Sequence, residues 1–162
     1  VQGIDTASAS MIGQNLGAKK IDRAGKTTIC TVVLTLICAC VSSFICLAIP
    51  HVIFRAFTKD SAVIDLGVTF LRIFIVHFFA SAITGSFQAM VTGCGFVELG
   101  FLIGLFDGLI CKIGFGLLFT RVFDMGYQGI WWGVACSRII PGLICVAYYL
   151  SGKWKTKKLL TE

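Results

Sequence analysis

Charged residues are scarce in this sequence, and their scarcity excludes a water-soluble fold. They make up 14% of the 162 residues, against about 25% in soluble domains. Hydrophobic residues reach 57%, and the mean hydropathy is +0.91. A chain this short cannot hide so much apolar surface from water.

The sequence also lacks the motifs of common enzymes and metal sites. It contains no GxSxG or HExxH sequence and no glycine-rich phosphate loop, and its two histidines lie on different predicted elements. The eight cysteines include no CxxC pair and most lie in apolar segments, which is typical of packing residues. A disulfide framework is the alternative, although such scaffolds are short and polar. We therefore expect no catalysis, no metal and no cofactor.

The few charges gather in short runs that separate apolar stretches of roughly 20 residues, the length of a membrane-spanning helix. This pattern predicts an all-α integral membrane protein, and Pro50 marks the end of one span. Because the chain opens at Val1 without an initiating Met, we expect it to belong to a longer protein. The predicted spans are 1–16, 27–49, 66–92, 99–123 and 130–150, followed by a basic tail at 151–162.

Lysine and arginine are distributed unevenly between the two ends of these spans. Because basic connections stay in the cytoplasm, the count predicts a multi-pass protein of the plasma membrane with a cytoplasmic C-terminus, and it explains the net charge of +6 without nucleic acid. Tyr127, Trp131 and Trp132 then mark the outer interface, and Trp154 lies near the inner one. The cytoplasmic side receives Lys19, Lys20, Arg23, Lys26, Lys153, Lys155, Lys157 and Lys158, and the outer side receives Arg55, Lys59 and Arg121.

Small residues recur at helical spacing in two of the spans. Gly100, Gly104 and Gly108 form one GxxxGxxxG stripe, and Gly13 and Gly17 repeat the spacing in the first span. Such stripes let helix backbones approach closely in lipid, so we predict helix-packing faces. The alternative is that glycine is simply frequent in membrane helices.

Asp107 and Arg138 are charged residues predicted at membrane depth, where charge is costly and often functional. Asp107 lies roughly 13 Å along the helix from Glu98, at about 1.5 Å per residue. At 100° per residue it shares its side with small residues, which points it into the bundle. Pro141 is expected to bend the helix near Arg138. The residues on the side of Asp107 are Gly100, Gly104, Cys111 and Gly114.

A polar row in the third span is the second candidate feature. His77, Ser81, Thr84 and Gln88 lie at i, i+4, i+7 and i+11, on one side of an otherwise apolar helix. This row is predicted to line a wet cavity for a substrate or an ion. The alternatives are that the row only joins helices, and that Asp107 and Arg138 form a purely structural ion pair.

The segment SASMIGQNLGAKKIDRAGK resembles the multidrug and toxic compound extrusion (MATE) family of transporters. The stretches FQAMVTGCGFVELGF and GYQGIWWGVACSRIIPGLICVAYYLSGKWKTKKLL resemble the last three helices of its clostridial-type members. The resemblance implies twelve helices in two six-helix lobes and export of drugs in exchange for Na⁺ or H⁺. This chain then supplies most of the C-terminal lobe, and the N-terminal lobe is an expected partner. The motif residues are Gly13, Gln14, Leu16, Gly17, Ala18, Arg23 and Ala24.

Some family members carry a coupling carboxylate in the helix that matches residues 66–92, whereas this chain has Arg72 and His77 there and no Asp or Glu. Asp107, or residues outside this chain, would then couple the ion. Our main hypothesis is an efflux antiporter for lipophilic cations that works by alternating access in the lipid bilayer. A lipid-linked oligosaccharide flippase is the first alternative, supported by Arg72, Lys112 and Arg138. A membrane scaffold that transports nothing is the second.

Overall fold

The computed structural model describes residues 1–155, and within them every regular element is helical. The predicted all-α fold class is therefore confirmed. The α-helices are α1 (Gln2–Gly17), α2 (Ile21–Ala48), α3 (Pro50–Arg55), α4 (Ser61–Gly93), α5 (Val97–Leu105), α6 (Lys112–Leu117), α7 (Tyr127–Ser137) and α8 (Ile139–Leu150). Two π-helical segments, η1 (Phe106–Cys111) and η2 (Leu118–Val122), and a 3₁₀ turn, η3 (Lys153–Lys155), complete the chain.

Four helical stretches among the described residues are long and apolar enough to cross a membrane, namely Ile21–Ala48, Ser61–Gly93, Val97–Val122 and Tyr127–Leu150. The remaining predicted span corresponds to α1, which has 16 residues. The helices α2 and α4 begin before the predicted residues 27 and 66, because polar first turns remain helical outside the apolar stretch. At the start of α4, the Asp60 side chain accepts a hydrogen bond from the N–H of Ala62 at 2.9 Å and caps the helix.

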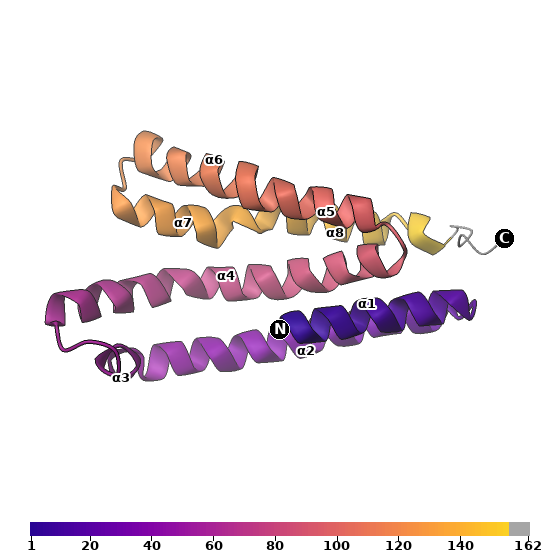
Figure 1. The fold of residues 1–162 in the computed structure, drawn as a ribbon, viewed down its shortest axis with the longest axis horizontal. Helices are drawn as coiled ribbons and strands as arrows, with labels where there is room; N and C mark the ends of the chain where they lie inside the picture. The colour runs from indigo at the N-terminus through magenta and orange to yellow at the C-terminus, as the bar shows by residue number, and fades with distance from the viewer. Residues whose placement is uncertain (156–162) are drawn as a thin grey trace.

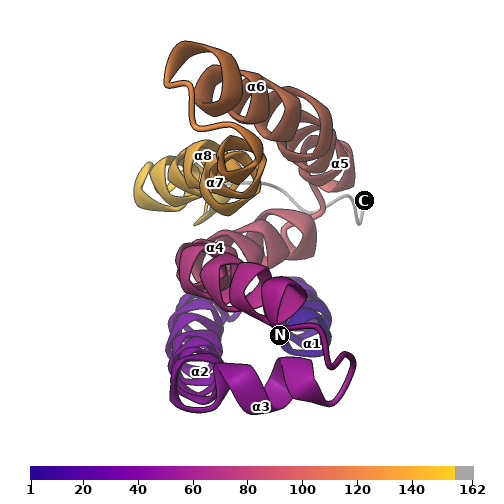
Figure 2. The same ribbon diagram turned by 90° about the vertical axis from the view of Figure 1, so that its left-hand side faces the viewer.

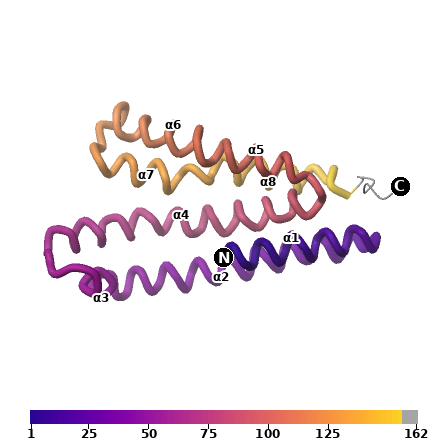
Figure 3. The backbone as a smooth tube through the Cα atoms, viewed as in Figure 1, coloured from indigo at the N-terminus to yellow at the C-terminus, as the bar shows by residue number. Residues whose placement is uncertain are grey.

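The long helices run side by side, and successive connections alternate between the two ends of the bundle (Figures 1 and 3). The α1–α2 turn, the α4–α5 turn and η3 lie at one end, whereas α3 and the α6–α7 turn lie at the other. The fold therefore places Lys19 and Lys20 at the same end as Lys153 and Lys155, and Arg55 at the opposite end. Which end faces the cytoplasm stays a prediction, and Lys157 and Lys158 lie outside the described residues.

Helix α4 is the centre of the bundle. Seen along the helices, it lies between the α1–α2 pair and the group formed by α5 to α8 (Figure 2). Polar contacts join it to α2, where the Thr35 hydroxyl lies 2.9 Å from the Ser86 hydroxyl and donates to the Ala82 carbonyl at 3.2 Å. Many large apolar side chains on the outer faces remain exposed, among them Phe44 and Phe101, as expected of surfaces that meet lipid.

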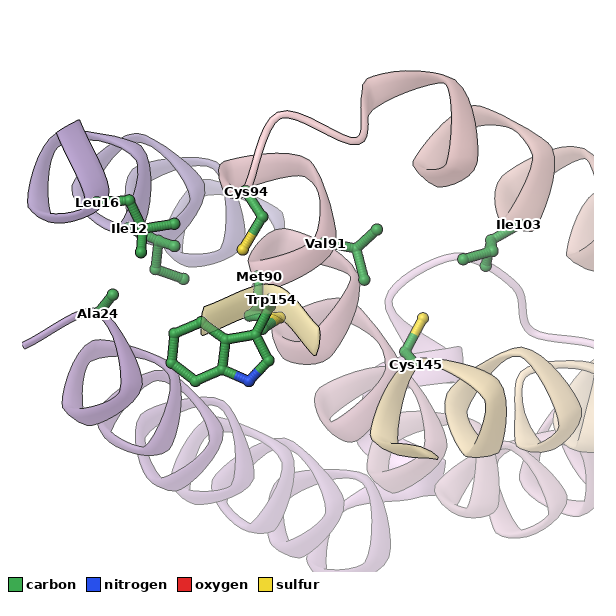
Figure 4. Packing of buried hydrophobic residues seen from close by; sticks show 9 residues of the cluster. All are labelled: Ile12, Leu16, Ala24, Met90, Val91, Cys94, Ile103, Cys145 and Trp154. Carbon is green, nitrogen blue, oxygen red and sulfur yellow. The ribbon is translucent and has the colours of Figure 1, made fainter. Parts of the chain in front are cut away.

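A buried apolar cluster joins Trp154 of η3 to α1, α2 and α4 (Figure 4). Trp154 is 3% exposed, stacks on Tyr149 with ring centroids 5.6 Å apart, and donates its indole N–H to the Tyr149 carbonyl at 3.0 Å. It also packs beside Gly25 at the start of α2, so it lies at the membrane end predicted from the sequence but faces inward. The cluster contains Ile12, Leu16, Ala24, Met90, Val91, Cys94, Ile103, Cys145 and Trp154.

None of the eight cysteines, all within residues 1–155, forms a disulfide. Cys94, Cys111 and Cys145 are buried between helices, whereas Cys30 and Cys40 are exposed on the outer face of α2. The disulfide framework considered above is therefore absent from this part of the chain.

Helix backbones approach each other most closely at glycines. A Cβ atom at Gly133 of α7 would lie 2.5 Å from the backbone nitrogen of Gly116 in α6, and one at Gly129 would lie 2.7 Å from Phe119 backbone. Gly129 and Gly133 form a GxxxG pair that our sequence analysis did not single out.

The glycines that we did single out have varied surroundings. A Cβ at Gly100 would lie 2.5 Å from Cγ2 of Thr92, one at Gly13 would lie 3.3 Å from the Gly93 carbonyl oxygen, and one at Gly104 would lie 3.7 Å from Nε2 of Gln88. Nothing lies within 4 Å of such an atom at Gly17 or Gly108.

Candidate substrate and ion site

The last span is interrupted at Arg138, between α7 and α8. Pro141 has no N–H to give to the Ser137 carbonyl, and its ring clashes with that carbonyl in a regular helix. The regular α-helix ends at Ser137 and resumes at Ile139, and Arg138 between them keeps a right-handed helical backbone with φ −76° and ψ −9°. The helix is therefore interrupted three residues before Pro141, and the bend expected there stays a prediction.

Two side chains of α4 bond to peptide carbonyls near this interruption. The Thr84 hydroxyl donates to the Arg138 carbonyl at 2.9 Å, and Nδ1 of His77 donates to the Val134 carbonyl at 3.2 Å. Ser81 lies 3.5 Å from the other ring nitrogen of His77. These hydrogen bonds join α4 to the segment between α7 and α8 and fix the position of that segment.

Gln88, the last residue of the polar row, points to a different neighbour. Its amide Nε2 donates to the Gly100 carbonyl in α5 at 3.0 Å. The row thus connects α4 with two other helical segments, which is the helix-joining role that we considered. Its role as a cavity wall stays a prediction.

Asp107 lies in the π-helical segment η1, where the wider turn changes which side chains face the bundle. Asp107 is 7% exposed, and Cys111 and Gly100 are buried on the same side. Gly104 and Gly114, which regular 100° spacing places beside Asp107, are exposed instead. Single π-helical turns are rare and occur often at functional sites.

Asp107 and Arg138 form an ion pair across the break, with Oδ2 3.5 Å from Nε. This distance exceeds the roughly 2.7–2.9 Å of a strong charge-assisted hydrogen bond. The second carboxylate oxygen, Oδ1, and the Arg138 Nε are both buried without a hydrogen-bond partner among the described residues. Unpaired buried polar atoms cost free energy, so the pair retains capacity for another ligand.

Asp5 of α1 is the site residue that our sequence analysis left out. A Cβ atom at Gly85 would lie 2.5 Å from its Oδ2, and its Oδ1 is buried without a hydrogen-bond partner. Gly85 follows Thr84 on α4, so Asp5 and Arg138 flank the same turn of that helix and interact electrostatically. Its spacing of four from Ala9 and seven from Ile12, which lie against Gly93 of α4, is the signal that could have identified it.

Three charged residues from separate segments therefore lie around one turn of α4, Asp107 and Arg138 in contact and Asp5 beside Gly85. Asp107 pairs with the Arg138 guanidinium, whereas Asp5 interacts with it only through longer-range electrostatics. His77 lies within electrostatic range of both Asp107 and Arg138, and of the half-buried Lys112, whereas Arg72 is exposed. No group of three His, Cys, Asp or Glu side chains in the described part of the chain is arranged to hold a metal ion.

This helical bundle with a charged centre defines the chain as part of a multi-pass membrane protein. The chain belongs to the MatE family, whose sequence profile matches residues 1–118. The resemblance to MATE proteins is thereby confirmed, and the clostridial subtype stays a prediction.

Several known proteins resemble nearly the whole chain. The probable multidrug resistance protein NorM of Thermotoga maritima is 21% identical over 160 residues, which are 99% of this chain and 34% of that protein. Human multidrug and toxin extrusion protein 1 is 20% identical over 94% of this chain and 27% of its own length. Protein DETOXIFICATION 37 of Arabidopsis thaliana is 25% identical over 94% and 30%. The chain thus spans about a third of the length of these relatives.

A solved structure shows the same fold. It is described as the inward-facing conformation of a multidrug resistance MATE family transporter of the MOP superfamily. It matches with a TM-score of 0.76 and 20% identity, over 95% of this chain and 36% of that protein.

Proposed function

We propose that the full-length protein containing this chain exports lipophilic cations, such as drugs or toxins, in exchange for Na⁺ or H⁺. The observation that carries the proposal is the incompletely paired cluster of Asp5, Asp107 and Arg138. The relatives support it, since their names describe multidrug resistance or multidrug and toxin extrusion. The N-terminal lobe of the same protein completes the transporter.

The charges of the cluster favour a cationic ligand. With both carboxylates ionised and His77 neutral, the three charged groups carry a net charge of −1. A net negative charge at membrane depth is costly, and a bound cation removes that cost. When a cation binds the Asp107 carboxylate, it displaces the Arg138 guanidinium. The guanidinium can then turn towards Asp5, on the other side of the Thr84–Gly85 turn.

This exchange suits an antiporter. A drug cation, a coupling ion and the Arg138 guanidinium compete for the same carboxylates, so one cation leaves when another binds. If the two conformations of the transporter hold the cluster differently, that competition shifts the equilibrium between them. Because α4 carries no Asp or Glu between residues 66 and 92, the coupling carboxylate that we propose is Asp107, which pairs directly with Arg138.

We place the protein in the plasma membrane with the basic end of the bundle and the C-terminus in the cytoplasm. The gathering of Lys19, Lys20, Lys153 and Lys155 at one end supports this orientation. The flippase alternative requires a cavity rich in free basic groups, but Arg138 is paired with Asp107 and Arg72 is exposed. The charge cluster and the names of the relatives therefore favour the exporter over the flippase.

The test is ethidium efflux from cells that express the full-length protein, with Na⁺ or proton gradients imposed in turn. We expect one of the gradients to drive efflux and its collapse to stop it. Cells with an empty vector provide the control. Failure of both gradients to drive efflux of ethidium or of other lipophilic cations would contradict the exporter and favour a flippase or a scaffold.

A further inference from the structure

A groove of about 570 Å³ runs between α1 and α2 on the outside of the bundle. On α1 it is lined by the side that carries Ile4 and Met11, whereas Ile12 on another side packs against α4. On α2 its walls include Cys30 and Leu34. The groove is separate from the charge cluster, and most of its wall is hydrocarbon.

The floor of the groove has no free polar group at its centre. The Thr31 hydroxyl of α2 donates to the Ser8 hydroxyl of α1 at 2.7 Å, and this bond holds the two helices together beneath the groove. Thr31 also bonds the Thr27 carbonyl at 2.9 Å. With these groups satisfied, the groove accepts an apolar chain at little desolvation cost.

One end of the groove is basic. Arg23 and Lys26, one turn apart on α2, line it at the end of the bundle where the basic connections gather. Both are exposed, and among residues 1–155 neither forms an ion pair, although Asp22 is adjacent in sequence. Two free cations at the end of an apolar groove are complementary to a ligand with an anionic head and a hydrocarbon tail.

The length of the groove matches one leaflet of a bilayer. Arg23 and Leu34 are separated by about 16 Å along α2, at roughly 1.5 Å per residue. Half of a hydrocarbon core of about 30 Å is about 15 Å. A single acyl chain that starts at the basic end therefore reaches Leu34 near the middle of the membrane.

We propose that this groove binds one anionic phospholipid, with the phosphate on Arg23 and Lys26 and an acyl chain between α1 and α2. The site uses Arg23, whose place in the family motif the charge cluster does not explain. The proposal does not depend on drug transport. A helix of the same protein is the competing occupant, but it supplies no phosphate for the two basic residues.

The test is native mass spectrometry of the full-length protein in detergent, titrated with phosphatidylglycerol or with phosphatidylcholine of the same acyl chains. We expect one phosphatidylglycerol to bind more tightly than phosphatidylcholine. The double variant Arg23→Gln/Lys26→Gln should weaken phosphatidylglycerol binding about 30-fold, at roughly 1 kcal/mol per basic residue. Lys19→Asn/Lys20→Gln removes the same charge outside the groove and should leave binding unchanged; Asn suits the φ of 58° at residue 19.

A second variant tests the hydrocarbon part of the groove. Cys30→Phe fills the groove and leaves the charges in place, so it should also abolish tight phosphatidylglycerol binding. The proposal would be overturned if the two charge variants lost phosphatidylglycerol affinity equally, or if Cys30→Phe bound phosphatidylglycerol as tightly as the wild type. Either result would mean that general surface charge, and not the groove, binds the lipid. Equal affinity for the two lipids, or a cross-link from Cys30 to another helix of the same protein, would overturn it too.

Discussion

Asp107 and Arg138 meet at the centre of the bundle, where Oδ2 of the carboxylate lies 3.5 Å from Nε of the guanidinium. Each belongs to an irregular stretch of its helix: Asp107 to the π-helical segment η1, and Arg138 to the break before Pro141. Removal of one member of a buried ion pair is usually costly, because it leaves the other charge uncompensated. Here each member has a buried atom without a hydrogen bond, and Asp5 lies beside the neighbouring Gly85; our proposal is that the pair exchanges partners.

Arg138→Gln removes the tethered cation that competes for Asp107. We expect the affinity of the full-length protein for a lipophilic cation such as tetraphenylphosphonium to rise about tenfold, equivalent to roughly 1.4 kcal/mol, and its turnover to fall. Equilibrium binding of the radiolabelled cation measures the affinity. Arg72→Gln, which removes an exposed arginine from α4, is the matched control. Unchanged affinity in Arg138→Gln would show that the guanidinium does not compete.

Gly85→Ala tests the position of Asp5. The added methyl group would lie 2.5 Å from the Asp5 carboxylate, so we expect a loss of about 1–3 kcal/mol in stability. Asp5→Ala in the same protein should recover most of this loss, since the clashing group is gone. Gly114→Ala, where nothing lies within 4 Å, is the control and should be neutral or slightly stabilising. Thermal unfolding in detergent measures the stability of each variant. If Asp5→Ala does not restore the stability of Gly85→Ala, Asp5 is not in contact with Gly85.

Gly133→Ala tests the contact between α6 and α7. Its Cβ would meet the backbone of Gly116 at 2.5 Å, and a backbone cannot swing away as a side chain does. We expect a lower unfolding temperature and a loss of about 1–3 kcal/mol. Gly116→Ala adds the same methyl group where nothing lies within 4 Å and should be tolerated. If both variants unfold at the same temperature as the wild type, α6 and α7 are not in contact at Gly133.

Thr84→Val removes the hydroxyl that α4 gives to the Arg138 carbonyl at 2.9 Å. Hydrogen bonds between membrane helices average about 0.6 kcal/mol and reach about 1.7, so a loss within this range is expected. Thr92→Val is the control, because its hydroxyl bonds only to carbonyls of its own helix, at 3.0 Å. Chemical denaturation measures the free energy of unfolding of both variants. Equal free energies of unfolding would argue against the hydrogen bond from Thr84 to the Arg138 carbonyl.

The sequence predicted the helices better than the site, and the reason lies in the bilayer. Apolar length is a strong constraint on a spanning helix, so each predicted span corresponds to a helix of the bundle. The polar start of α2 from Ile21 was missed because it continues the helix outside the apolar stretch. The interruption between α7 and α8 lies where the missing N–H of Pro141 leads us to expect it.

The contacts around Asp107 depended on details that regular spacing does not contain. Asp107 lies in a π-helical turn that no local residue pattern announced, and Gly104 and Gly114 are exposed whereas Asp107 is buried. Asp5 was left out because its depth in the first span was uncertain, although its helical spacing from Ile12 was readable. The GxxxG pair Gly129 and Gly133 was readable too, but spacing does not tell which of several such pairs faces another helix.

The most direct measurement is gradient-driven ethidium efflux by the full-length protein carrying Asp107→Asn, compared with wild type and Asp107→Glu at equal membrane abundance. If Asp107 binds the exchanged cations, Asp107→Asn should lose efflux at least about tenfold, as expected when an intramembrane charge is functional. Asp107→Glu, which keeps the charge, should retain part of it. Efflux by Asp107→Asn at the wild-type rate, with the same dependence on pH and Na⁺, would contradict the account.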